Sequence, residues 1–165
     1  MGVERLWADW RSEYVSSADE ERDRTGCVIC NLVNATDDGE ALVLERTADT
    51  ITVMNLYPYG SGHLMVAPVQ HAAAYDDLDD AVNIAIARAQ LRALRAIRAA
   101  YRPDGVNVGA NLGKAAGAGV PGHLHVHVLP RWNGDTNFMT SIAEVRVLPE
   151  SLRTGYEKLK AAWPG

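Results

Sequence analysis

The stretch PGHLHVHVLPRW, residues 121–132, sets three of the chain's five histidines at alternate positions: His123, His125 and His127. Side chains of an extended strand point alternately to its two faces, so residues two apart lie about 6.6 Å from each other along one face. The stretch therefore predicts a strand with a row of three imidazoles on one face and with Leu124, Val126 and Val128 in the core. Three unrelated surface histidines are a weak alternative, because strict alternation of three rarely arises by chance.

An alternating histidine row supports two kinds of chemistry. The imidazoles can bind a transition metal, or one neutral imidazole can attack phosphorus while its neighbours orient the substrate and donate protons. The segment AGAGVPG, residues 116–122, lies directly upstream, and its main-chain N–H groups can bind phosphate oxygens. This favours the second chemistry, although a plain loop has the same composition.

Length and composition limit the class of protein. The 165 residues are 47% hydrophobic and 22% charged, which fits a single domain, 1–165, with a sizeable core. A net charge of -5 gives no general attraction to DNA or to anionic lipid, so we expect neither nucleic acid nor membrane as a partner. No stretch approaches the roughly 18 apolar residues of a membrane span, and the N-terminus has no signal-peptide core. We therefore expect a cytoplasmic protein.

The patterns around the histidine stretch predict an α+β fold. Residues 1–20 carry aromatic residues at helical spacing, which is typical of an amphipathic arm. β-rich runs separated by turn residues lie at 41–46, 50–55, 63–68, 106–112 and 123–130. Helical patterns lie at the segment that opens with Asp76–Asp80 and ends near Tyr101, and at 150–163. We expect one mainly antiparallel sheet of about five strands, with the long helix on one side and a C-terminal helix.

The chain has two cysteines, Cys27 and Cys30, in the element CVIC at 27–30. In a reducing compartment a pair at this spacing favours metal or redox chemistry over a structural disulfide. The spacing is that of half a zinc site, and a tetrahedral site needs two more ligands. The competing interpretation is a reduced pair that behaves as two small apolar residues. A thioredoxin-like role is the least favoured, because no βαβ pattern follows.

Several motifs together resemble those of one family. HLHVHVLPR, with two apolar residues after the last histidine, resembles the signature of the histidine triad (HIT) family of nucleotide hydrolases and transferases. NLYPYGSGHLMVAPVQH, residues 55–71, is similar to the strand-turn-strand that precedes the long helix in that family, and NVGANLG, residues 107–113, to the strand before the triad. NLYPY and the PRW ending resemble the branch of phosphorylases and hydrolases that act on diadenosine tetraphosphate. The resemblance implies a HIT-like fold with a catalytic core over 41–139, and a homodimer joined through the long helix and the neighbouring strand.

The resemblance also implies an activity and its catalytic residues. The chain would cleave a dinucleoside polyphosphate at the α-phosphate, with His125 as the nucleophile and a nucleotidyl-histidine as the intermediate. A main-chain carbonyl at the first triad position would hold the proton on the other ring nitrogen of His125. His127 would donate to the phosphate oxygens. His63 would also reach the phosphate site, and a histidine that only caps its turn is the alternative.

Further residues are assigned to the nucleotide by the same resemblance. Asn55 would contact ribose and Asn111 the phosphates, although either amide can equally form a turn. The turn before the triad, Gly117–Gly119, has Ala118 where the family often has glutamine or serine. Help for the leaving group would then come from main-chain N–H groups or a cation such as Mg²⁺, which leaves open whether water or phosphate is the acceptor. Trp132 would stack on a base, or else belong to the core or an interface.

Zinc-bearing relatives imply the two ligands that the cysteine pair lacks. The matching residues are His71 and His123, which together with Cys27 and Cys30 would hold a structural zinc ion. Two other functions stay open at this point. One is a nucleoside phosphoramidase of the same family, which would use the same residues, and the other is a non-catalytic protein that binds nucleotide or zinc.

Overall fold

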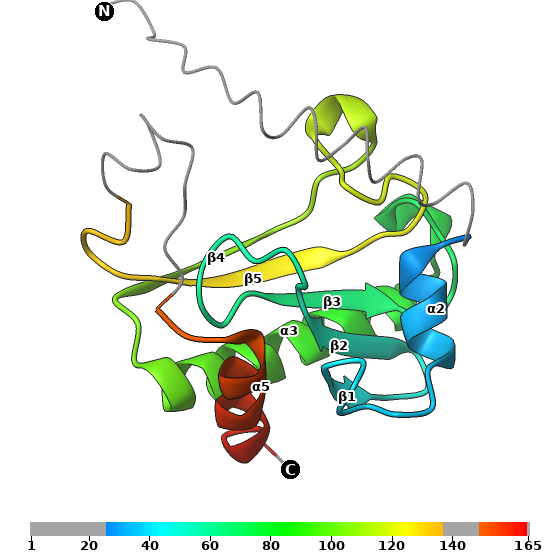
Figure 1. The fold of residues 1–165 in the computed structure, drawn as a ribbon. Helices are drawn as coiled ribbons and strands as arrows, with labels where there is room; N and C mark the ends of the chain where they lie inside the picture. The colour runs from blue at the N-terminus through cyan, green and yellow to red at the C-terminus, as the bar shows by residue number, and fades with distance from the viewer. Residues whose placement is uncertain (1–25, 137–148, 165) are drawn as a thin grey trace, which may run out of the picture.

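The computed structural model describes residues 26–136 and 149–164 (Figure 1). The predicted N-terminal arm at 1–20 and the last residues of the predicted core, 137–139, lie outside the described residues. The elements in chain order are α2 (Val28–Asn34), β1 (Val43–Arg46), β2 (Thr50–Met54), β3 (Leu64–Pro68), the 3-10 turn η1 (Tyr75–Asp77), α3 (Asp80–Tyr101), β4 (Gly105–Gly109), the 3-10 turn η2 (Lys114–Ala116), β5 (Val126–Arg131) and α5 (Leu152–Ala161).

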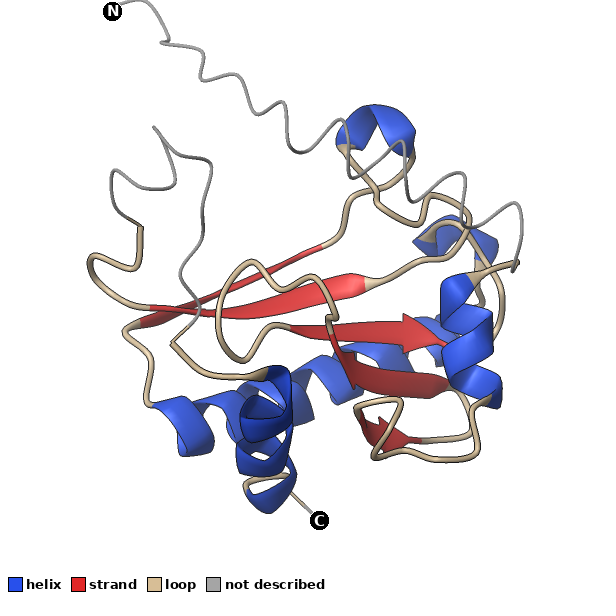
Figure 2. Cartoon of the chain, viewed as in Figure 1, coloured by secondary structure: helices blue, strands red, loops and turns tan. Residues whose placement is uncertain are grey.

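The strands form one five-stranded sheet in the order β1-β2-β3-β5-β4, and every neighbouring pair is antiparallel (Figure 2). The predicted α+β class and antiparallel sheet are confirmed. β5 lies between β3 and β4, and His127 pairs with Met65 on one side and with Gly109 on the other. The histidine stretch therefore lies inside the sheet, while β4 forms one edge of it.

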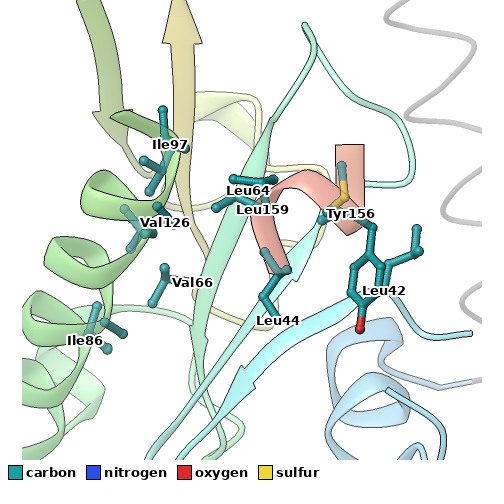
Figure 3. Close-up of a cluster of buried hydrophobic side chains, with 14 of the residues drawn as sticks. Leu42, Leu44, Leu64, Val66, Ile86, Ile97, Val126, Tyr156 and Leu159 are labelled. Atoms are coloured by element: carbon teal, nitrogen blue, oxygen red, sulfur yellow. The ribbon is translucent and has the colours of Figure 1, made fainter. Parts of the chain in front are cut away.

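The main core lies between one face of the sheet and the helices α3 and α5 (Figure 3). Its buried side chains come from both helices and from four strands or their flanks, and include Leu44, Leu64, Val66, Ile86, Ile97, Val126 and Leu159. Leu124, Val126 and Val128 all belong to this core, as the alternation predicts. Because strand side chains alternate, the histidine at position 127 points to the opposite face.

Helix α3 begins and ends as its sequence predicts. The side chain of Asp79 accepts a hydrogen bond from the N–H of Val82 at the N-terminus, which satisfies one of the free donors there. At the C-terminus Arg102 takes a left-handed conformation, and Pro103 follows. No helix in the described part of the chain is long and apolar enough to cross a membrane.

The opposite face of the sheet carries a second, smaller core under helix α2. Ile29 of α2 packs on Ile51, Val53 and Ala67 of the sheet, and Val120 of the turn before β5 packs against the same cluster. The sequence pattern predicted only a cysteine element at residues 27–30 and did not predict this helix. It has seven residues and no side-chain cap at its N-terminus, so no start signal marks it. The N-terminus of α2 thus lies on the face that carries His127.

Candidate functional site

The three histidines do not form the predicted surface row. β5 begins at Val126, so His123 and His125 precede the strand, and both are buried, with 1% and 4% of their surface exposed. The N–H groups of this segment bond to turn and loop carbonyls instead of a neighbouring strand: His123 donates to Val120 at 3.3 Å and Leu124 to Ala72 at 2.6 Å. Because of this path of the main chain, the side chain of His123 points toward the cysteine pair, while the rings of His125 and His127 lie next to each other.

The ring of His125 is oriented by a main-chain carbonyl. Its Nδ1 lies 2.8 Å from the main-chain oxygen of His123. A carbonyl oxygen only accepts hydrogen bonds, so Nδ1 carries a proton, and in the neutral ring the lone pair is on Nε2. The ring of His127 lies 5.1 Å away, centroid to centroid, and almost perpendicular. The Nδ1 contact is the one that the sequence predicts for a neutral His125, and its role as the nucleophile stays a prediction.

His127 is oriented by a second chain of hydrogen bonds. The main-chain N–H of Tyr59 donates to Nδ1 of His63 at 3.0 Å. An N–H only donates, so a neutral His63 carries its proton on Nε2, which lies 2.9 Å from Nδ1 of His127. His127 then accepts at Nδ1 and presents a proton on its Nε2. This series of hydrogen bonds places the ring proton of His127 on Nε2, from which it can donate.

His63 is fully buried, with 0% of its surface exposed, and its Nε2 contacts His127. A direct contact between His63 and the phosphate stays a prediction. Tyr59, which the sequence analysis did not single out, places its ring 4.7 Å from that of His63 and 5.6 Å from that of His127. The aromatic residue between a turn proline and a glycine was the only sequence signal for it.

The turn that carries His63 is closed by Asn55. The Asn55 side-chain oxygen accepts from the N–H of Tyr57 at 2.9 Å, and its main-chain N–H donates to the carbonyl of His63 at 3.0 Å. Asn55 is only 8% exposed, so its structural role is to form the turn, and a contact with ribose stays a prediction. Gly62 has a φ of +71°, and a Cβ there would lie 2.7 Å from the Tyr101 ring. Only glycine fits this position.

Two main-chain N–H groups of the glycine-rich turn before the triad, which were expected to bind phosphate, donate to carbonyl oxygens just upstream in the chain. The N–H of Gly117 donates to Lys114 at 2.9 Å and that of Ala118 to Gly113 at 3.2 Å, while the Asn111 amide donates to the carbonyl of Gly117 at 3.3 Å. In this conformation the N–H groups of Gly117 and Ala118 already donate within the turn, and a contact of these residues with phosphate stays a prediction. A role of Gly119 or Asn111 at the phosphates stays a prediction.

Open space lies beside His127. Gly109 of β4 pairs directly with His127 and so faces the same side of the sheet. A Cβ added at Gly109 would meet no atom of the described residues within 4 Å.

Trp132 lies away from this centre. It follows the end of β5, and its ring packs edge-on against Tyr101 at 6.1 Å. It lies five positions after His127, or about 17 Å along an extended chain. A stacking contact with a base would need the far end of a long substrate, and this role stays a prediction.

Four side chains from three segments form a candidate metal centre: Cys27, Cys30, His71 and His123. Their ligand atoms all lie within 4.8 Å of one another. The Nδ1 of His123 lies 3.3 Å from the sulfur of Cys27, and that of His71 lies 3.2 Å from the sulfur of Cys30. Two thiols and two imidazoles are a donor set that tetrahedral zinc uses.

The protonation of His123 suits a metal ligand. Its Nε2 donates to the carbonyl of Pro68 at 2.9 Å, which leaves the lone pair of Nδ1 toward the two sulfurs. Burial lowers the pKa of His123, so the ring is neutral at neutral pH, as a ligand must be. Burial also raises the pKa of Cys30, as does the neighbouring Cys27 thiol. His71 lies exposed at the edge of the cluster, where an ion can enter.

Arg46 fixes the helix that carries the cysteines, and the sequence analysis missed it. Its guanidinium donates to the carbonyl oxygens of Leu32 and Val33 at 2.9 and 2.8 Å, and it pairs with Asp38 at 2.6 Å. These bonds satisfy free carbonyls at the C-terminus of α2, where a cation is favoured. The position of the cysteine pair thus depends on a residue of β1.

Comparisons with known proteins show which proteins this chain is similar to. A family model of the HIT domain matches residues 38–134. The chain is 38% identical over 165 residues to the AP-4-A phosphorylase of Mycobacterium tuberculosis (strain CDC 1551 / Oshkosh). The matched region covers 98% of this chain and 85% of that protein. It is 26% identical over 135 residues to the adenosine 5'-monophosphoramidase hnt1 of Schizosaccharomyces pombe, covering 82% of this chain and 96% of that protein.

A solved structure with a bound metal has the same fold. It is that of a Zn-bound histidine triad family protein from Mycobacterium smegmatis, with a TM-score of 0.68 and 29% sequence identity, covering 83% of this chain and 92% of that chain.

Proposed function

The chain belongs to the HIT domain family, and from that premise we propose that it is an enzyme that cleaves dinucleoside polyphosphates of the diadenosine tetraphosphate type at the α-phosphate. The observation that carries this proposal is the hydrogen bond from Nδ1 of His125 to the carbonyl of His123, which places a proton on Nδ1 and makes Nε2 the attacking nitrogen. The 38% identity to a protein named AP-4-A phosphorylase supports the substrate class.

The residues of this chain supply nucleophile and donor. Nε2 of His125 bonds to the α-phosphorus while the bond from phosphorus to the bridging oxygen breaks, and the remaining polyphosphate leaves with the electron pair. The ring gains a positive charge, and its Nδ1–H stays bonded to the His123 carbonyl. His127 donates from Nε2 to the phosphate oxygens as charge develops. A second attack, by the acceptor, then frees the ring of His125.

We propose inorganic phosphate as the acceptor, since the AP-4-A phosphorylase relative is named for that reaction. The polyphosphate would arrive with a divalent cation such as Mg²⁺, because the turn at Gly117 and Ala118 uses its N–H groups internally. The test is incubation with diadenosine tetraphosphate with and without phosphate, and mass analysis of the products. ADP and ATP formed only with phosphate support a phosphorylase, AMP and ATP formed without it support a hydrolase, and two ADP without phosphate contradict attack at the α-phosphorus.

A phosphoramidase of the same family is the second candidate, which the likeness to the adenosine 5'-monophosphoramidase favours. The ratio of kcat/KM for diadenosine tetraphosphate to that for an adenosine phosphoramidate separates the two. We expect the dinucleotide to be the better substrate, because 38% identity to the phosphorylase exceeds 26% to the phosphoramidase.

We further propose that Cys27, Cys30, His71 and His123 hold a structural zinc ion, which joins three segments of the chain when it is bound. The donor set, the distances and the tautomer of His123 support it. Metal analysis of the purified protein tests it, and one zinc ion per chain is the expected result. The two thiols are free, which suits a reducing compartment such as the cytoplasm.

A second copy of the chain is the proposed partner. β4 is an edge strand, and within the described residues no strand pairs with its outer side. Val108 of this strand and Leu112 just after it are 45% and 44% exposed, and an exposed apolar edge strand is a pairing surface. Sedimentation should therefore give a dimer, and Val108→Lys should shift it to the monomer.

A further inference from the structure

One peptide unit connects the candidate metal centre to the nucleophile. It is the unit between residues 123 and 124. Its carbonyl, from His123, accepts the hydrogen bond from Nδ1 of His125 at 2.8 Å. Its N–H, from Leu124, donates to the carbonyl of Ala72 at 2.6 Å. The orientation of this unit therefore sets where the ring of His125 lies and which of its nitrogens carries the proton.

Both ends of this peptide unit are attached to residues of the metal cluster. His123, which contributes the carbonyl, places its Nδ1 3.3 Å from the Cys27 sulfur. Ala72, which accepts from the N–H, directly follows His71, whose Nδ1 lies 3.2 Å from the Cys30 sulfur. An ion held by these ligands ties the two segments together on both sides of the unit.

Without such an ion, the described contacts that hold the turn are few. His123 bonds through Nε2 to Pro68 at 2.9 Å and through its N–H to Val120 at 3.3 Å. The turn before it, residues 116–122, contains three glycines, which allow many backbone conformations, and Val120 packs it on the second core. The carbonyl of His123 would then depend on these contacts.

We propose that the metal cluster is a positioning device for catalysis: by clamping the peptide unit 123–124 it holds His125 with the proton on Nδ1 and the lone pair on Nε2. This inference rests on the proposed nucleotidyl transfer, and it assigns to His71 and the cysteines a role in the reaction that they perform without touching the substrate. His71, although exposed at the surface, is a positioning residue for His125.

The decisive readout is the tautomer of His125 itself. Two-bond ¹H–¹⁵N spectra of ¹⁵N-histidine-labelled full-length protein report which ring nitrogen carries the proton, and His125→Gln assigns the signals by their loss. In the zinc-loaded protein we expect a single Nδ1–H form. After chelation, and in His71→Ala, we expect a mixture of both tautomers and a single-turnover rate of adenylylation about tenfold lower, in the range found when partners of metal ligands are removed.

Two further variants separate positioning from loss of stability. His71→Cys keeps a zinc donor at an exposed position, so it should keep both the Nδ1–H form and the rate. Ile97→Val weakens the main core, to which no residue of the metal cluster belongs, so this variant should melt at a lower temperature and keep the tautomer. The proposal is overturned if folded, metal-free protein or His71→Ala retains the single Nδ1–H form, or if the purified protein binds no zinc. Because the spectra need no substrate, a failure of the proposed turnover would be seen separately.

Discussion

His125 and His127 lie side by side, but the molecule orients them in different ways. His127 is oriented by His63 and the N–H of Tyr59, which belong to one turn closed by Asn55. His125 is oriented by a peptide unit whose supports come from α2, from the loop after β3 and from the turn before β5. The donor thus depends on a local turn and the nucleophile on long-range contacts. We therefore expect substitutions in the local turn to affect His127, and changes in the metal centre to affect His125.

The largest effect should follow from removing the nucleophile. His125→Ala should lower the turnover of diadenosine tetraphosphate by at least about 10³-fold, because the nucleotidyl intermediate then has no nitrogen on which to form. Nucleotide affinity should change little, which calorimetry can measure. Equal turnover by the variant and the wild type would reject His125 as the nucleophile, and a wild type that binds nucleotide but never turns it over would support the non-catalytic alternative.

The donor side should have the next largest effect. His127→Leu should lower kcat by about 10²-fold, since it removes one donor to a developing charge. Rapid-quench kinetics should show the loss in the formation of the intermediate. A change in KM alone would mean that His127 only binds substrate.

A smaller effect should come from the turn behind His127. His63→Leu removes the hydrogen bond to Nδ1 of His127, and we expect kcat to fall about tenfold, the value of one such bond. His63→Gln is the matched control, because its amide can accept from Tyr59 and donate to His127, and it should keep most of the rate. If both variants lose the same activity, orientation of His127 through His63 is not the reason.

The smallest effect should come from Arg46, which binds the C-terminus of α2. Arg46→Met removes the bonds to the last carbonyls of the helix, so zinc affinity should fall by a few-fold to about tenfold. Lys160→Met is the control, because Lys160 also donates to a main-chain carbonyl, that of Leu44 at 2.9 Å, but does not contact α2. Competition with a zinc-sensitive dye measures both. Equal affinities in the two variants would exclude a role of Arg46 in the metal centre.

The same difference between local and long-range contacts explains which features of the fold and the site could be predicted from the sequence. The alternation in residues 123–128 predicts the core side of β5, because strand periodicity is a local property. It did not predict that β5 starts only at Val126, since that depends on a hydrogen bond from Leu124 to Ala72, far away in the chain. The role of Arg46 was missed for the same reason, whereas Tyr59 was missed because it acts through its main-chain N–H, which side-chain patterns do not reveal. His71 and His123 were found only through the resemblance to zinc-bearing relatives.

The most direct test of the account is to trap the intermediate. The enzyme is mixed for milliseconds with diadenosine tetraphosphate labelled at the α-phosphorus, quenched in alkali and digested, and the labelled peptide is sequenced. We expect the label on His125, in the peptide that contains Leu124 and Val126. Rapid consumption of the nucleotide with label on another residue, or with none on the protein, would contradict the account.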